Sequence, residues 1–515
     1  MPVTNTHPDF DLALPQWTRI ADALDGTDAV KRAGDAYLPM LDGHRENPDS
    51  HARYVSGALF YGATERTVAA LVGAVFRKDP TVEVPGRIKP RLDNVNGAGD
   101  GIYTFAKRLV RHVLSFGRYG LLVEAPTPGD DGRAPLPDPA SVASGLPWIA
   151  GYEARDIRCW RTRLVAGTPV LDQVILQEQV EVPGDDEFGF KVETQYRVLD
   201  LDEAGLYRVR LFRRTGRGYE AVREYLPTPT GKRIPYIPFT FVGPNDLRPE
   251  VSRAPILDLV DVNLSHFRSS ADLEEGRSKL AFPLPVVVGA ESEPFPLKFG
   301  GNWALWLPAG GDAKFLEFTG NGLSELAAAL PQKENYMAAL GARLLQEPKR
   351  AAEAAETQYL RQSSENSTLA SCAKTAADAL KVSLSRMAEW VSASGEVTVE
   401  LNTDFFDVPL APATVTALVA AVQANLLPID EFLWVLKQGE MIRDETSIED
   451  ARRMLEQEQP ALLGRAMDLG GAPAPGTPAR AGGTPPARPP AAANADRGAN
   501  RATRDRLDPR TRRQG

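Results

Sequence analysis

Few residues in this 515-residue chain have types and spacing that could do chemistry. Gly231-Lys232 resembles the end of a phosphate-binding loop, but Arg233 stands where Ser or Thr would bind Mg²⁺, and no glycine lies five residues before Gly231. The stretch Gly97-Ala-Gly-Asp-Gly101 has glycines that could approach a phosphate, yet no strand precedes it and the dinucleotide-binding spacing is incomplete. We interpret the first as a hairpin turn and the second as a loop that enters a helix.

Metal ligands and nucleophiles do not occur in any recognisable spacing either. Asp200, Asp202 and Glu203 could bind calcium, but a turn between two strand-forming runs explains them better. Cys159 and Cys372 lie in unrelated contexts, which suits a reducing cytoplasm. There is no HExxH pair and no GxSxG elbow, so we read all five histidines as surface or packing residues: His7, His44, His51, His112 and His266. We therefore expect no catalytic residue, no bound metal, no cofactor and no enzymatic activity.

The charge of the chain is distributed unevenly. The formal net charge is -9, but residues 471–515 carry nine Arg and three Asp, so the rest of the chain is clearly acidic. A protein that grips nucleic acid tightly normally shows the opposite sign over its folded part. A protein that surrounds DNA and lets it slide does not need a positive charge over its folded part.

The sequence shows no sign of export or of insertion into a membrane. The N-terminal residues MPVTNTHPDFDLALP have acidic residues and prolines where a signal peptide needs a basic and then an apolar stretch. No window reaches 18 uncharged apolar residues. We expect neither a secretory signal nor a membrane span.

The longest helical patterns lie in the second half of the chain. The first is expected to open with Ser252 as N-cap and Pro255 in its first turn, and to continue to Leu280. A second helix and a third, which starts at about Glu353, follow later. Their apolar residues recur at three/four spacing: Leu323, Leu326, Leu330, Met337, Leu340 and Leu344 in the second, and Leu369, Cys372, Ala376, Leu380, Leu384, Met387 and Val391 in the third.

A compact insert separates the first two of these helices. Residues 282–319 are rich in Pro, Gly and strand formers, so they cannot be helix. Trp303 and Trp306 could stack on a base or ligand, although so small a module needs large apolar side chains merely to have a core. Two long helices that bracket a small β module resemble a strut with a head more than a catalytic core.

The remaining elements place helices before strands. Helical patterns cover 17–24, 29–41, 51–76 with a break at Gly62, and 102–116. Strand patterns follow at 121–124, around Tyr152 and Ile157, and at 174–182, 190–199, 206–212 and 237–241. After the long helices, the sequence predicts a strand at 396–401 and helices at 414–425, 429–437 and 447–457. Beyond Leu469 the chain has too few apolar residues to fold alone, and the fold class is α+β.

The order of these segments resembles that of a tailed-bacteriophage portal protein. The local phrases are similar to those of the prophage portal subfamily known as a domain of unknown function: FYGATERTVAALVGAVFRKDP, RYGLLVEAP, YEARDIRCWR, LDLVDVNLSHFRSSADLEE and MAALGARLLQ. The resemblance covers about Ala52 to Met441. No single phrase is catalytic, so its specificity comes from the number and the order of the phrases.

This resemblance implies a subunit of a ring, usually a homododecamer, at one capsid vertex of the virion, assembled in the host cytoplasm. The implied partners are double-stranded DNA in the channel, terminase, a head–tail adaptor, and the major capsid and scaffolding proteins, with no membrane. Lys349 and Arg350 would contact DNA. The implied regions are an N-terminal helical wing (1–147), a β-rich wing subdomain (148–250), a first stem helix (251–281), a small α/β clip (282–320), a second stem helix (321–346), a channel loop (347–353), a long wing helix with a return strand (354–410), a helical crown (411–468) and a disordered basic tail (469–515).

Two other classes of protein compete with the portal interpretation. A nucleic-acid-processing enzyme of the packaging machinery needs a Walker loop or a carboxylate metal cluster, and the sequence has neither in recognisable form. Another structural virion protein, such as a head–tail adaptor or a minor capsid component, stays open as the alternative. Adaptors are usually much shorter than this chain.

Overall fold

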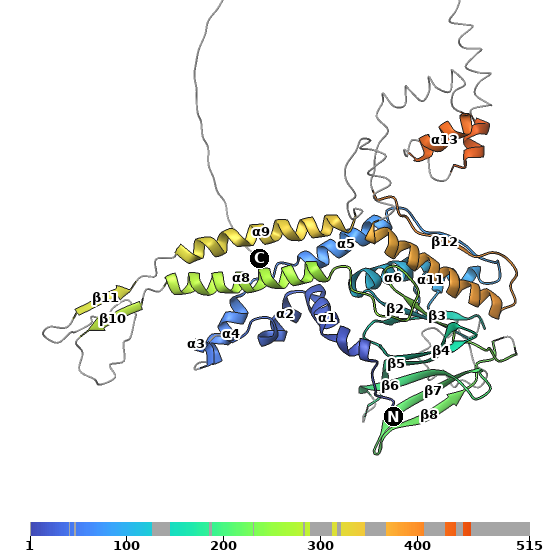
Figure 1. Ribbon diagram of the computed structural model, residues 1–515, viewed down its shortest axis with the longest axis horizontal. Coiled ribbons are helices and arrows are strands. Elements are labelled where there is room, and N and C mark those ends of the chain that lie inside the picture. Colours follow the sequence, from blue (N-terminus) through green and yellow to red (C-terminus); the bar gives the residue numbers. More distant parts are fainter. Residues whose placement is uncertain are drawn as a thin grey trace, which may run out of the picture. The chain divides into compact units, whose positions relative to one another are not determined.

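The computed structural model describes residues 2–40, 42–45, 48–125, 145–184, 188–229, 231–281, 284–288, 312–316, 321–345, 367–405, 428–438 and 446–454. These residues belong to two compact units, Met1–Val408 and Pro409–Gly515. The first unit combines helices with sheets whose described strand pairs are all antiparallel (Figure 1). The predicted α+β class is therefore confirmed. Within the described residues, no helix has both the length and the apolar character needed to cross a lipid bilayer.

The N-terminal region is helical: α1 (Pro8–Asp25), α2 (Thr27–Ala33), α3 (Asp42–Arg45), α4 (Pro48–Gly57), α5 (Ala63–Val75) and α6 (Ile102–Phe116). Helix α1 begins well before the predicted range, because Pro8 occupies its first turn and the His7 ring accepts a hydrogen bond from Asp9 N at 3.1 Å. The break near Gly62 is confirmed, and α6 has the predicted bounds.

Close packing at the end of α6 decides where the first long helix begins. Gly117 ends α6 with φ +69°, and a Cβ at this position would lie 2.8 Å from the carbonyl oxygen of Ser252. The backbone at Ser252 and Arg253 therefore packs against Gly117 and is not helical. Helix α8 (Leu257–Ala281) starts only at Leu257. The predicted N-cap at Ser252 is wrong, because this tertiary contact overrides the local capping signal.

A three-stranded sheet forms the floor of the core. Its central strand β2 (Tyr119–Glu124) pairs with β3 (Trp148–Glu153) on one side and with β9 (Phe239–Val242) on the other. Every residue of β9 is buried. The sheet thus joins strands from both sides of the predicted boundary at residue 147. A separate pair links β1 (Thr81–Glu83) to β12 (Thr398–Glu400).

A five-stranded meander follows β3, in the order β4 (Ile157–Val165), β5 (Thr168–Pro183), β6 (Phe190–Leu201), β7 (Tyr207–Thr215) and β8 (Gly218–Tyr225). Each strand pairs with the next one along the chain, so hairpins connect them. The sequence patterns predicted four of these strands but missed β8. This edge strand has no buried residue and therefore lacks the apolar alternation that marks a strand.

A buried ion-pair network joins the two sheets. Arg197 on β6 is 2% exposed, and its Nε lies 2.6 Å from Glu178 Oε1 on β5. Its Nη1 lies 2.5 Å from Glu124 Oε1 on β2. Tyr152 on β3 donates a hydrogen bond to Glu178 at 2.7 Å. Strands of both sheets thus share one set of charges, and these contacts offset the cost of removing the charges from water.

Helix α11 (Thr368–Trp390) covers the three-stranded sheet and packs against α6 (Figure 1). Ser367 caps it by accepting a hydrogen bond from Ala370 N at 3.1 Å. The predicted apolar face is fully buried from Leu369 to Met387, whereas its last residue, Val391, is the C-cap and only partly buried. Part of the predicted range for this helix, residues 353–366, lies outside the described residues.

The second unit is described only in two short segments. Helix α13 (Ile429–Gln438) agrees with the predicted helix at 429–437. Residues 448–454 are helical, and Ser447 Oγ accepts a hydrogen bond from Asp450 N at 3.0 Å, as a capping box requires. The predicted helix at 414–425 and the tail 469–515 lie outside the described residues.

Candidate functional site

Two long helices and a β-hairpin module make the most distinctive structure in the chain. Helix α8 is followed after two residues by β10 (Leu284–Val288), which pairs antiparallel with β11 (Asp312–Leu316). Helix α9 (Asn321–Arg343) then runs beside α8 (Figure 1). The helix, β module and helix predicted from the sequence are confirmed in this order. Trp303 and Trp306 lie outside the described residues.

The helix pair is tightly packed near the β module. A Cβ at Gly276 on α8 would lie 2.3 Å from Leu323 Cδ2 on α9. The missing side chain therefore lets Leu323 sit directly against the backbone of α8. This position explains why a glycine, which weakens a helix, stands inside α8.

A lysine connects the two helices at mid-length. Lys333 Nζ on α9 donates to Ser269 Oγ at 2.7 Å, to Ser265 Oγ at 2.9 Å and to the Ser265 carbonyl oxygen at 3.0 Å. Burial lowers the pKa of Lys333, and the positive charge of Arg268 acts in the same direction. The ammonium group thus uses its three donors on α8 and fixes the register of the two helices.

The inner end of the pair is anchored on the N-terminal helices. Met337 on α9 packs with Ala63 and Leu259, and a Cβ at Gly341 would lie 2.8 Å from Thr67 Cγ2 on α5. On α8, Asn263 is fully buried, and its Oδ1 accepts hydrogen bonds from Thr64 N and Oγ1. The pair is thus rooted in the first unit at one end and carries the β module at the other.

Helices α3 and α4 support the acidic side of α8, through His44 and Tyr54 respectively. Tyr54 OH donates to Asp272 Oδ1 at 2.6 Å, and His44 Nε2 lies 3.2 Å from Glu275 Oε1. Burial raises the pKa of the Tyr54 phenol, and its hydrogen bond to Asp272 raises it further. At every physiological pH, Tyr54 therefore stays a neutral donor that holds α4 and α8 together.

Helices α8 and α9 differ sharply in the share of their residues that is buried. Helix α8 has buried residues up to Leu273, whereas among residues 322–345 only Met337 and Gly341 of α9 are buried. Tyr336 on α9 is half exposed. One long side of α9 is therefore left uncovered by the described residues.

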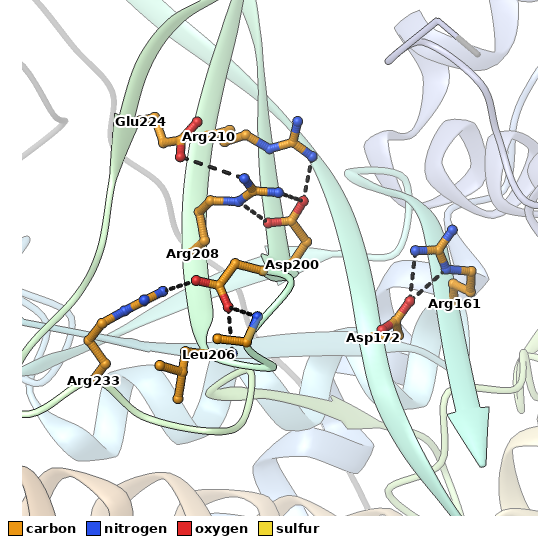
Figure 2. Close-up of polar contacts among 10 residues, drawn as sticks. Arg161, Asp172, Asp200, Leu206, Arg208, Arg210, Glu224 and Arg233 are labelled. Carbon is orange, nitrogen blue, oxygen red and sulfur yellow. Dashed lines mark hydrogen bonds and ion pairs between the residues drawn. The ribbon is translucent and has the colours of Figure 1, made fainter. Parts of the chain in front are cut away.

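Two of the three acidic residues that could have bound calcium, Asp200 and Asp202, are held by arginines instead (Figure 2). Arg208 on β7 donates two hydrogen bonds to Asp200, from Nε to Oδ1 at 2.9 Å and from Nη2 to Oδ2 at 3.1 Å. Arg210 also donates to Asp200 Oδ2. Guanidinium groups fill the places that a cation would take, so Asp200 serves the β6–β7 pairing.

Asp202 shapes the turn after β6. Its Oδ1 accepts hydrogen bonds from Ala204 N and Leu206 N, both at 2.9 Å, and its Oδ2 accepts one from Arg233 at 2.6 Å (Figure 2). The hydrogen bond from Leu206 N and then the one from Arg233 hold the pKa of Asp202 below its usual range. The interpretation of this acidic segment as a turn between two strands is confirmed.

Neither glycine motif has the geometry of a phosphate site. Gly231 has φ +75° and donates to the Thr228 carbonyl oxygen in a turn. In the loop 97–101, the N–H groups of Ala98 and Gly99 donate to asparagine side chains at 2.8 Å. The loop then enters α6 as predicted, with its N–H groups turned toward its own side chains instead of a ligand.

Among the described contacts of the histidines, only the His44 and His51 rings lie near each other, with centroids 5.6 Å apart and Tyr54 beside both. The His7 ring stacks on Trp160, and the other four contact Glu275 (His44), the Leu38 carbonyl oxygen (His51), Glu153 (His112) and Glu334 (His266). Burial lowers the pKa of His7, His112 and His266. In the part of the chain that the structure describes, no group of three or more His, Cys, Asp or Glu could hold a metal ion.

The sequence patterns gave no sign of the buried arginines, and two of these contact side chains of the sheets. Arg118 is 2% exposed and lies 4.0 Å from the Trp160 ring and 4.6 Å from the Phe241 ring, while its Nη1 donates to the Pro249 carbonyl oxygen. Burial lowers its pKa to about 9. Arg197 is the second. Arginines are usually exposed, so no local pattern marks these two as structural centres.

The predicted DNA-contact residues, Lys349 and Arg350, lie outside the described residues, as does the whole predicted channel loop 347–353. The described chain stops at Leu345 and resumes at Ser367. Near these two ends, Leu369 N donates to the Leu344 carbonyl oxygen at 3.1 Å, so the chain on either side of the segment is held close together. The role of Lys349 and Arg350 in DNA contact stays a prediction.

Comparison with known proteins gives one family match. A model described as "Domain of unknown function (DUF4055)" matches residues 255–391. This range runs from just before α8 to just after α11, so the matched domain comprises the helix pair, the β module and the long covering helix. Comparison with curated proteins gives no match.

Three solved structures are similar to this chain at low identity. A chain in the neck of an empty gene transfer agent (GTA) particle, computed with C6 symmetry, is 14% identical, with a TM-score of 0.36, over 73% of this chain and 90% of the other. A chain in the virion of the native GTA particle is 14% identical, with a TM-score of 0.37, over 74% of this chain and 91% of the other. A chain in the neck of the native GTA particle, computed with C12 symmetry, is 15% identical, with a TM-score of 0.36, over 73% of this chain and 89% of the other. With TM-scores this low, we draw nothing about function from them.

Proposed function

We propose that this chain is the portal subunit of a tailed bacteriophage. In this proposal, a ring of identical subunits at one capsid vertex is the conduit for DNA packaging and ejection. The ring also binds terminase during packaging and a head–tail adaptor afterwards, and it contacts the major capsid and scaffolding proteins during assembly in the host cytoplasm.

The observation that carries the proposal is the half-covered helix pair. Helices α8 and α9 are locked to each other by the Gly276–Leu323 contact and by Lys333, yet one long side of α9 is covered by nothing in the described part of the chain. A helix of this length needs tertiary packing to be stable. In a ring, each subunit offers the same cover to its neighbour, so the exposed side is buried identically in every copy.

The regions of the proposed subunit follow from this assignment. Helices α8 and α9 are the stem, β10 and β11 belong to the clip, and the N-terminal helices with the sheets make the wing. Helix α11 is the long wing helix, β12 is the return strand, and α13 belongs to the crown. A dodecamer is the subunit number that the family resemblance implies.

The proposed channel chemistry is weak attraction on an acidic background. An acidic body repels the phosphate backbone, so DNA does not stick. Lys349 and Arg350, repeated around the ring in the channel loop, provide contacts that moving DNA can exchange. Force for DNA entry comes from a separate terminase motor, because the proposed subunit hydrolyses no nucleotide.

Electron microscopy of the purified protein in negative stain tests the proposal. We expect rings with a central hole wide enough for duplex DNA. A compact monomer at micromolar concentration would contradict the proposed ring. Open tubes, or rings that bind another ring but no terminase, would favour a head–tail adaptor or another structural virion protein.

A further inference from the structure

A cleft of about 710 Å³ lies beside the three-stranded sheet and has no role in the function proposed above. Its floor is Phe239 and Phe241 of β9, and one wall is Val382 and Arg386 of α11. The opposite wall is the β4–β5 hairpin, through Pro169 and Leu171 among others. The cleft is therefore mainly apolar, with aromatic rings at its base.

The cleft also carries positive charge. Its lining includes Arg386 and Arg248, and Glu250 is the one carboxylate residue among the described lining residues. Arg386 Nη1 donates to Thr240 Oγ1 at 2.8 Å, and burial lowers the pKa of Arg386. The Arg386 guanidinium carbon also lies 5.5 Å from the centre of the Tyr236 ring, and Tyr236 and Glu389 act to raise its pKa. An added carboxylate would stabilise this largely buried cation further. An apolar ligand segment with a carboxylate therefore fits this cleft.

The apolar wall continues onto the surface of the β4–β5 hairpin. In the strand register, Leu164 lies opposite Pro169, and Thr162 lies opposite Leu171, so these four side chains share one face. Leu164 is 74% exposed. The cleft thus has an apolar lip that the rest of the described chain does not cover.

The opposite end of the same sheet presents a matching shape. Strand β5 runs from the cleft to the β5–β6 hairpin, where Phe190 and Val192 are 68% and 56% exposed. Glu181 lies opposite Val192 in the register, on the same face as Phe190. An aromatic ring, an aliphatic side chain and a carboxylate therefore stand together on this exposed hairpin.

The hairpin cannot reach the cleft of its own chain. Leu171 and Pro183 are twelve positions apart along β5, and that length of extended strand spans about 40 Å. The two complementary surfaces can meet only between different copies. Because the surfaces differ, such a contact is heterologous, and its repetition closes a ring or extends a filament.

We propose that the β5–β6 hairpin of one subunit docks in the β9–α11 cleft of its neighbour, with Phe190 against the aromatic floor and Glu181 beside Arg248 and Arg386. This inference rests on the ring proposed above and names a contact that would hold its wing region together. The occupant of the cleft is a second copy of this chain.

The first test is assembly of substituted full-length chains, followed by sedimentation velocity. The hairpin variant is Phe190→Asp, and the cleft variant is Leu164→Asp with Arg248→Glu, all at exposed positions that leave the core intact. We expect each variant to weaken assembly on the order of 100-fold, because Phe190→Asp would bury a carboxylate against the aromatic floor, and Arg248→Glu would face Glu181 across the contact. Val222→Asp on the edge strand β8, also half exposed, is the matched control and should assemble normally.

The second test traps the contact directly. A chain with both Phe190→Cys and Leu164→Cys, treated with a short bismaleimide, should give a ladder of covalent multimers, whereas neither single variant should. Absence of the ladder, or normal assembly of the hairpin and cleft variants, overturns the docking proposal while rings of the wild-type chain leave the portal proposal standing. A wild-type chain that stays monomeric overturns both.

Discussion

Replacing Arg197 by methionine should lower the stability of the sheet region and reverse the pH dependence of that stability. Methionine keeps much of the side-chain volume but removes the charge, so the buried carboxylates of Glu178 and Glu124 lose their partner. Breaking a buried pair by removing one partner costs about 3–5 kcal/mol. The expected loss corresponds to about 100- to 4000-fold lower hydrogen-exchange protection in the β6 amides.

The sign of the pH effect follows from the two states of Glu178. In the wild-type chain, burial acts to raise its pKa, but the charge of Arg197 and the hydrogen bonds from Arg197, Tyr152 and Gln195 hold it below its usual range. That stabilisation is present above the unfolded pKa of about 4.3 and is lost as the pH falls through the folded pKa. Without Arg197, burial alone raises the pKa of Glu178, so the variant recovers stability as the pH falls.

The measurement is hydrogen exchange of the full chain at pH 7 and pH 5, corrected for intrinsic rates. The difference in protection between the wild-type chain and Arg197→Met should be largest at pH 7 and smaller at pH 5. Arg161→Met is the matched control, because Arg161 pairs with Asp172 at an exposed site (Figure 2) and should cost less than about 1 kcal/mol. Equal losses in both variants, or a difference that does not shrink at pH 5, would refute the reasoning.

Three further predictions follow from the helix pair and the predicted DNA contacts. Gly276→Val should destabilise the outer end of the pair by about 1–3 kcal/mol, seen as faster exchange in α9, whereas Gly322→Val, whose Cβ meets nothing within 4 Å, should not. Replacing Lys349 and Arg350 by Ala should leave rings intact and reduce DNA packaging or retention, and DNA-filled heads at normal yield would contradict this. Deleting residues 471–515, with their nine Arg, should preserve rings and lower the salt-dependent affinity for duplex DNA. An unchanged salt slope would leave the tail without an electrostatic role.

Local patterns were a good guide where one residue period dominates. Helix α6 has its predicted bounds, because its apolar residues recur with the helical period and Gly117 ends it with positive φ. The helix pair and the β module between its members were also found from period and composition. Strand β8 was missed, because an exposed edge strand carries no apolar alternation.

Contacts between distant residues could not be read from the sequence. The start of α8 depends on Gly117, which is far away along the chain and displaces the cap expected at Ser252. Arg118 and Arg197 are central to the packing of the sheets, but nothing next to them distinguishes them from surface arginines. The candidate cleft likewise combines β9, α11 and a hairpin, which only the fold brings together.

Helices α9 and α11 show why a repeating apolar pattern does not determine burial. Both carry apolar residues at three/four spacing, yet Leu380, Leu384 and Met387 of α11 are fully buried, whereas Met337 is the one predicted apolar residue of α9 that is buried. The pattern records that a face must be covered, not what covers it. For α11 the cover is the sheet and α6 of the same chain. For α9 the main contacts among the described residues are with α8 and α5. In the proposed ring, a neighbouring stem is a cover for the exposed side that every copy can give and receive.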